Sequence, residues 1–144
     1  MPSVRRTGLV AGLTVAPLAA AFRFAHVYRM RAGFPRRRPP RFSPTDLGLP
    51  YAEMTIRSDS GELPAWFIPA RDGAPGPAVL LVHGWDSARD RTLPTAQFLH
   101  AAGFHCLTFD VRGNGANPAE VLPVSAGEYG ADATAAFAAL VARP

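Results

Sequence analysis

The sequence contains no lysine, and all fifteen of its Lys or Arg residues are arginine. So complete a preference for arginine indicates codon usage in a GC-rich, bacterial type of genome rather than a function. The sequence also has a single cysteine, Cys106, so no disulfide can form within the chain. Nothing in the sequence therefore makes the fold depend on an oxidising compartment.

Acidic side chains are absent from the first 45 residues, which carry nine arginines. The remaining residues carry six arginines and all eleven acidic side chains, so they have a net charge of −5. The high sequence pI, near 10.2, thus comes from the arginines of the N-terminal tail. It says nothing about what the folded body binds. A chain of 144 residues predicts one domain, which we place at residues 51–144.

Charge is also missing from Gly8–Phe22, an apolar run in which Thr14 is the only polar residue. A helix of that length covers about 22 Å, short of the ~30 Å hydrocarbon core of a membrane. Extension to Tyr28 reaches about 21 residues and includes Arg23, which could reach the headgroups near the helix end. We therefore predict a hydrophobic anchor helix over residues 8–28.

Arginine counts on either side of the apolar run predict its orientation. Arg5 and Arg6 precede the run, and seven arginines follow it up to Arg41. By the positive-inside rule, a bacterial inner-membrane protein of this pattern has its domain in the cytoplasm. The alternatives are export by a cleaved signal peptide with its site at Ala19–Ala21, a transit peptide, or an interfacial helix.

Arginine and proline dominate the segment that follows the apolar run. The cluster at residues 36–41 predicts contact with anionic membrane lipid in preference to nucleic acid, because it adjoins an apolar run. The Pro-rich stretch through Pro50 is typical of a linker. Residues 1–50 are therefore predicted to be an anchor helix followed by a juxtamembrane linker.

The pattern from residue 51 onward predicts an α/β domain. Strands are expected at Tyr51–Ser58 and Leu63–Pro69, joined as a hairpin by an Asp-Ser-Gly turn. Pro64 favours an edge position for the second strand because proline cannot donate to a ladder. A further strand is expected at Phe104–Phe109.

Two helices are expected around these strands. The first runs from Thr92, as N-cap, to Ala102, and the second covers Gly127–Arg143. The first helix should bury Leu93, Ala96, Phe98, Leu99 and Ala102. The second should bury Tyr129, Ala133, Ala136, Phe137, Leu140 and Val141.

The apolar run Ala78–Val82 predicts a strand of a parallel sheet that is covered on both faces. Ligands of such sheets bind just beyond the carboxyl ends of the strands. His83, Gly84 and Trp85 follow this strand directly, so they are the first candidates for a functional site.

Two motifs together resemble the α/β-hydrolase fold, in particular its serine hydrolases such as esterases, lipases and acyl-peptidase-like enzymes. The first is the strand that ends in His83-Gly84, and the second is the strand that ends in Asp110-Val-Arg-Gly-Asn-Gly115. The resemblance covers residues 51–144. It implies the N-terminal part of such a sheet, with an antiparallel hairpin and then parallel strands with crossover helices, preceded by the hydrophobic helix.

The resemblance also implies roles for particular residues. The backbone N–H of Trp85 would be one donor of an oxyanion hole, and His83 and Gly84 would support its loop. A second set would be structural, with the arginine paired to a carboxylate or to loop carbonyls; it comprises Asp110, Arg112, Gly113 and Gly115. No metal or cofactor is expected, because His83 has no second ligand at a suitable spacing.

A Gly-x-Ser-x-Gly elbow is absent from the sequence, so no residue of a catalytic triad is assigned. Ser87, Ser125, His100 and His105 lack the required context. We expect a truncated or partial membrane-anchored hydrolase that acts on ester, thioester or amide bonds only in its complete form.

Two other functions are alternatives to this one. The first is a non-catalytic membrane-associated or interaction protein. The second is a nucleotide-binding module, suggested by Gly113 and Gly115, but Pro118 stands where the third glycine of that motif would be.

Overall fold

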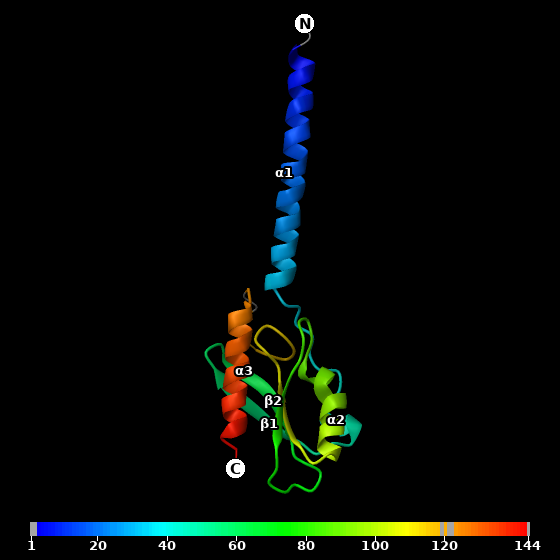
Figure 1. Ribbon diagram of the computed structural model, residues 1–144, viewed down its shortest axis with the longest axis vertical. Coiled ribbons are helices and arrows are strands. Elements are labelled where there is room, and N and C mark those ends of the chain that lie inside the picture. The colour runs from blue at the N-terminus through cyan, green and yellow to red at the C-terminus, as the bar shows by residue number, and fades with distance from the viewer. Residues whose placement is uncertain (1–2, 119, 121–122, 144) are drawn as a thin grey trace. The chain divides into compact units, whose positions relative to one another are not determined.

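The chain divides into two compact units, residues 1–34 and residues 35–144. The computed structural model describes residues 3–118, 120 and 123–143, without the side chains of residues 3–14 (Figure 1). The boundary between the units lies earlier than the predicted one, because the stretch that follows residue 34 belongs to the folded body.

The first unit is one helix, α1 (Ser3–Gly33), with Pro17 inside it. Among the described residues, no helix is both long and apolar enough to cross a membrane. Within the part of α1 whose side chains are described, Arg23, Arg29 and Arg31 interrupt the apolar positions. A membrane-spanning helix over residues 8–28 is therefore not supported, and the side chains of its first half lie outside the description.

A four-stranded sheet organises the described part of the second unit (Figure 1). Its strands lie in the order β1 (Ala52–Ser58), β2 (Gly61–Ile68), β4 (His105–Phe109) and β3 (Ala78–Val82). β2 pairs antiparallel with both β1 and β4, and β3 pairs parallel with β4. The predicted hairpin and the parallel pair are thus confirmed, and β3 lies at one edge of the sheet.

Pro64 does not lie in an edge strand, contrary to the prediction. β2 is an inner strand, but its pairing with β4 begins only at Ala65, opposite Phe109. The carbonyl of Pro64 accepts a hydrogen bond from the backbone N of Asp110 at 2.9 Å. Because N and C=O of one residue point to the same side of a strand, the missing N–H would face the carbonyl of Asp110, which accepts from Asn117 Nδ2 at 3.3 Å instead.

Helices cover both faces of the sheet. On one face the 3-10 turn η2 (Arg89–Thr92) leads into α2 (Leu93–Ala101), and on the other lies α3 (Ala126–Val141). Thr92 precedes α2 as predicted, but its hydroxyl donates to the carbonyl of Arg89 at 2.7 Å and does not cap the helix.

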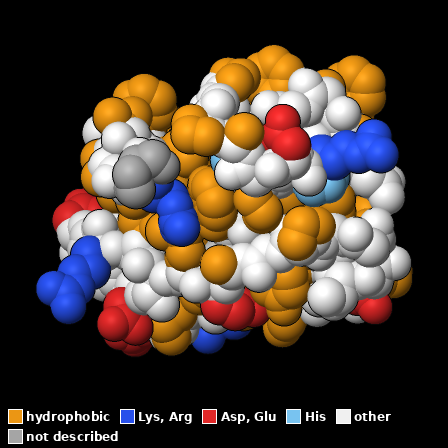
Figure 2. All heavy atoms as spheres, turned by 90° about the horizontal axis from the view of Figure 1, so that it is seen from below, with side chains coloured by type: hydrophobic (Ala, Val, Ile, Leu, Met, Phe, Trp, Pro, Cys, Tyr) orange, Lys and Arg blue, Asp and Glu red, His pale blue; other side chains and the backbone are white. Residues whose placement is uncertain are grey.

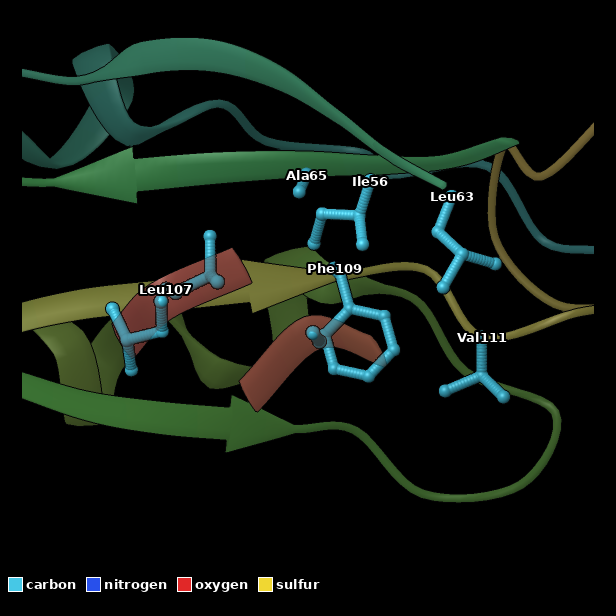
Figure 3. Packing of buried hydrophobic residues seen from close by; sticks show 8 residues of the cluster. Ile56, Leu63, Ala65, Leu107, Phe109 and Val111 are labelled. Atoms are coloured by element: carbon cyan, nitrogen blue, oxygen red, sulfur yellow. The ribbon is translucent and has the colours of Figure 1, made fainter. Parts of the chain in front are cut away.

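Each face of the sheet has its own hydrophobic cluster. Beneath α3, side chains of three strands and of the turn after β4 pack together (Figure 3); the labelled ones are Ile56, Leu63, Ala65, Leu107, Phe109 and Val111. Beneath α2, the buried members are Leu49, Trp66, Ile68, Leu93, Ala96 and Cys106. The strand residues alternate between the two clusters because successive side chains of a strand point to opposite faces.

Several residues that were expected to be buried are exposed. In β3, Ala78 and Val82 are exposed and the residues between them are half-buried, because no strand among the described residues covers that edge. On the helices, Phe98, Phe137 and Val141 are also exposed, since they point away from the sheet. Figure 2 shows hydrophobic side chains at the surface of the face seen from below.

The Pro-rich segment is part of the body rather than a free linker. The backbone N of Arg36 donates to Asp86 Oδ1 at 2.6 Å, and that of Arg41 donates to Asp90 Oδ2 at 2.9 Å. A short 3-10 turn, η1 (Pro44–Leu47), follows. The buried residues of the segment are Pro35, Pro44 and Leu49. Contact of its arginines with lipid stays a prediction.

Candidate functional site

The residues singled out from the sequence meet at one edge of the sheet. The loop from His83 to Ala88 follows β3, and the turn from Asp110 to Asn117 follows β4. Because β3 and β4 are parallel neighbours, their carboxyl ends lie side by side. His83 Nε2 lies 3.8 Å from Asp110 Oδ1, so the two motifs are in contact.

Asp110 joins the two segments through its carboxylate, which is fully buried. Its Oδ1 accepts from the backbone N of Arg89 at 2.7 Å. Its Oδ2 accepts from Nη1 of the same arginine at 2.9 Å and from the backbone N of Ala116 at 2.8 Å. One carboxylate thus fixes the end of the loop after β3 and the turn after β4.

Arg89 is a site residue that sequence reasoning missed. Its guanidinium is nearly buried, pairs with Asp110, and lies over the Trp66 ring at 4.2 Å from the centroid. A buried charge needs such a partner, because removal from water is costly. The sequence gives no signal that separates Arg89 from the exposed Arg91 two residues later.

Glycine is required at Gly115 by both conformation and space. Its φ is +55°, and a Cβ there would lie 2.1 Å from Asp110 Cγ. Gly113 has φ +71°, and a Cβ there would lie 2.7 Å from Pro35 Cγ. Both glycines have a left-handed backbone conformation, and each lies so close to a neighbouring side chain that a Cβ would not fit.

Arg112 pairs with carboxylates, the first of the two alternatives that the sequence left open. Its backbone N and its Nε donate to Asp132 Oδ2 at 2.9 and 3.0 Å, and its Nη2 donates to Asp132 Oδ1 at 2.7 Å. Nη2 also donates to Asp59 Oδ1. The hydrogen bonds to Asp132 are the main reason that the pKa of Arg112 is raised.

Asp132 was missed in the sequence although a signal existed. It is fully buried on α3, and it lies three residues after Tyr129 and four before Ala136, on the face that the pattern placed against the sheet. A lone carboxylate on a buried helix face needs a cation or several donors. Arg112 was the available partner.

His83 is buried and has a partner on each ring nitrogen. Its Nε2 accepts from the backbone N of Val111 at 3.2 Å, and its Nδ1 lies 2.8 Å from the carbonyl O of Gly84. A main-chain N–H can only donate, so the ring proton must be on Nδ1, which donates to Gly84. Burial lowers the pKa of His83 and favours this neutral ring.

Trp85 follows at the surface, with 37% of its area exposed. Within the described part of the chain, its backbone N–H has no hydrogen-bond acceptor. Its indole ring lies 6.2 Å from the ring of Tyr129, centroid to centroid. The next residue, Asp86, has φ +53°, and its carboxylate accepts from the backbone of Arg36. The N–H is therefore without an acceptor, among the described residues, in a loop that is held on both sides.

The other candidates have structural contacts. Ser125 caps α3 by accepting from the backbone N of Glu128 at 3.3 Å, and His100 Nδ1 contacts the carbonyl of Pro69 at 2.7 Å. His105 lies at the start of β4, at the opposite end from the site. The carbonyl of Ser87 accepts from the backbone of Gly115 at 3.2 Å. Among the described residues, no group of three or more metal-binding side chains is placed to hold an ion.

Solved structures with a similar arrangement include an esterase and an α/β hydrolase. The Pyrococcus furiosus esterase Pf2001 aligns with a TM-score of 0.61 and 26% identity, over 76% of this chain and 41% of that protein. The α/β hydrolase GrgF from Penicillium sp. sh18 aligns with a TM-score of 0.59 and 27% identity, over 67% of this chain and 34% of that protein. This chain has an α/β-hydrolase-like fold.

The curated sequence relatives of this α/β-hydrolase-like chain do not indicate an activity, because both are uncharacterized. Two uncharacterized proteins of Mycobacterium tuberculosis, MT2364 and Rv2307c, are each 40% identical to it over 67 residues. The match covers 46% of this chain and 24% of each relative, so the chain spans about a quarter of the length of the curated relatives it matches. No family model matches the sequence.

Proposed function

We propose that the loop after β3 is the oxyanion-binding loop of an α/β-fold serine hydrolase acting on ester, thioester or amide bonds. The backbone N–H of Trp85 is one of its donors. The observation that carries this proposal is that N–H itself: it lies beyond the carboxyl end of a parallel strand and has no acceptor among the described residues.

The chemistry needs such a donor. Attack on an acyl carbonyl places negative charge on its oxygen, and a preorganised N–H aimed at that oxygen is worth about 3–4 kcal/mol. A Cβ at Gly84 would meet nothing within 4 Å, so the space beside this part of the loop is open to a substrate. The buried contacts of Asp110 and His83 keep the loop in one conformation, so little reorganisation is needed during the reaction.

Hydrolysis also needs a nucleophile, and the sequence contains no Gly-x-Ser-x-Gly elbow. The activity is therefore proposed for a protein in which another segment supplies that nucleophile. The first test is the DNA downstream of codon 144: a Gly-x-Ser-x-Gly motif encoded there, in frame or after a frameshift, supports the proposal. If none is found, the non-catalytic interaction protein becomes the better hypothesis.

The second test uses p-nitrophenyl esters and a joined product, in which the 144-residue chain continues into the sequence that encodes this motif. Trp85→Pro removes the N–H and should lower kcat by about 10²–10³-fold. Trp85→Phe keeps the N–H and is the matched control, which should retain most of the activity. Equal losses in both variants would contradict a role for the backbone donor.

The chain of 144 residues alone should not hydrolyse these esters. Its control is the double variant Ser87→Ala, Ser125→Ala, which should behave identically. Turnover that survives in the double variant would mean that another nucleophile is present, and the proposal would be wrong.

A further inference from the structure

The Trp85 donor belongs to a peptide unit that also contains the carbonyl of Gly84. A trans peptide is planar, so its C=O and N–H point in opposite directions. His83 Nδ1–H donates to the Gly84 oxygen at 2.8 Å. The imidazole therefore fixes the direction of that carbonyl, and with it the direction of the Trp85 N–H.

The preceding peptide unit is held from another element. The hydroxyl of Tyr129, on α3, donates to the carbonyl of His83 at 2.7 Å. The Tyr129 ring also contacts the His83 ring edge-on, with 6.5 Å between centroids, and lies beside the Trp85 ring. Burial raises the pKa of Tyr129 to about 12, so the hydroxyl keeps its proton and remains a donor.

Both holding side chains are themselves fixed by the fold. The His83 ring accepts from Val111, in the turn after β4. The helix that carries Tyr129 is tied to the same turn, because Asp132 binds Arg112. Two consecutive carbonyls before the donor are thus bound by side chains whose positions the sheet and α3 determine.

We infer that Tyr129 is a positioning residue for the Trp85 N–H, because it holds the peptide unit before the donor while the His83 ring holds the unit that contains it. This inference rests on the proposed function of the loop. Donation to the Gly84 carbonyl also polarises the peptide unit, which makes its N–H a better donor. Tyr129 itself need not touch a substrate.

The test uses ¹⁵N NMR of the full 144-residue chain and is independent of hydrolysis. In the wild type, the Trp85 amide should have an order parameter near that of rigid backbone, about 0.85. Tyr129→Phe removes only the hydroxyl and keeps the ring contacts, and it should lower this value toward about 0.6. Amides of β4 should not change. An unchanged Trp85 amide in a folded Tyr129→Phe protein would overturn the inference.

A matched pair at His83 tests the second contact. His83→Asn places an N–H donor near the position of Nδ1, whereas His83→Gln places an acceptor near that of Nε2. The Trp85 amide shift should stay close to the wild-type value in the asparagine variant and move in the glutamine variant. The opposite result would mean that only the contact with Val111 matters, and the inference would be wrong.

The two proposals can fail separately. If the joined product does not hydrolyse esters while the Trp85 amide responds as expected, the positioning is right and the proposed function is wrong. If hydrolysis occurs and the amide does not respond, the function stands and Tyr129 has no positioning role.

Discussion

Asp110 and Asp132 are both fully buried, and each binds an arginine and a main-chain N–H. Their partners differ in kind. Asp110 binds Arg89 and Ala116, which both lie in the segments that form the candidate site. Asp132 binds Arg112 and the hydroxyl of Ser58, at 3.0 Å, and so joins α3 to the hairpin of β1 and β2.

Asp110 therefore links the two segments of the site to each other, whereas Asp132 links one of them, the turn after β4, to α3 and to the hairpin. Removal of Asp110 should loosen the loop that presents Trp85. Removal of Asp132 should loosen α3 and its tie to the turn after β4, and should reach the loop only indirectly, through Tyr129 and Val111. The following changes test this distinction, in order of expected effect on the free energy of unfolding.

Asp110→Asn should have the largest effect. It leaves the Arg89 charge nearly buried without its counter-charge, which should lower the free energy of unfolding by about 3–5 kcal/mol. Urea denaturation followed by circular dichroism measures the loss. A change under about 1 kcal/mol would show that this pair does not hold the loop.

Gly115→Ala disturbs the same carboxylate without changing any charge. The added Cβ meets the Asp110 carboxylate at a positive φ, so the strain and the clash should together cost about 3 kcal/mol. Gly48→Ala is the control, because Gly48 has φ +70° and nothing within 4 Å of a Cβ. Its cost should be about 1–2 kcal/mol. Equal losses by urea denaturation would mean that the approach to Asp110 is unimportant.

Asp132→Asn should cost about 2 kcal/mol, because hydrogen bonds to a charged group are lost. The loss is smaller than for Asp110 because Arg112 keeps Asp59 and Glu128 nearby. Asp59→Asn removes an exposed partner and should cost about 0.5 kcal/mol or less. Thermal and urea unfolding of both variants check the order, which would be wrong if Asp59 proved the more important partner.

The pH dependence of stability tests His83, which adjoins Asp110. Its pKa is lower in the folded state than its ordinary value of about 6.5, so the unfolded chain binds more protons below that pH. Stability should therefore be constant above about pH 7 and fall as the pH drops below about 6.5. Urea denaturation between pH 8 and 5 measures this slope, and His83→Asn should reduce it. An equal slope in that variant would assign the effect to other groups.

Val82→Lys should have the smallest effect on the free energy of unfolding, because Val82 contacts neither the Asp110 nor the Asp132 network. Val82 is 41% exposed at the open edge of β3, so the substitution should change the free energy of unfolding by about 0.5 kcal/mol or less. A charge on an apolar edge strand should also reduce association between chains. Sedimentation velocity compares the wild type with Val82→Lys. Unchanged association would show that chains do not associate through this edge.

Local patterns predicted most of the secondary structure. The hairpin, the strand before His83, the strand before Asp110 and both later helices appear within a few residues of their expected positions. They were predictable because apolar periodicity, turn residues and caps act over a few residues. The anchor helix was predicted in the same way, yet the structure does not support a membrane span.

The candidate site was predictable only in part. The sequence pointed to His83, Trp85, Asp110 and Arg112, which the structure brings to one edge of the sheet. It did not reveal Arg89, because nothing local says which of several arginines becomes buried. Asp132 was missed although it lies on the predicted buried face of its helix, and Tyr129 was expected there only as a packing residue. It also misplaced Phe137, which is exposed because α3 packs through the face that carries Ala136 and Leu140.

The sequence by itself determined where the chain turns and which residues follow its buried strands, because these depend on neighbours along the chain. Only the tertiary structure decided which side chains meet. Arg89 reaches Asp110, and Tyr129 reaches the carbonyl of His83, through the packing of β3, β4 and α3. Those contacts act through space between segments far apart in the chain, and they hold the loop after β3, in which the Trp85 N–H has no acceptor among the described residues.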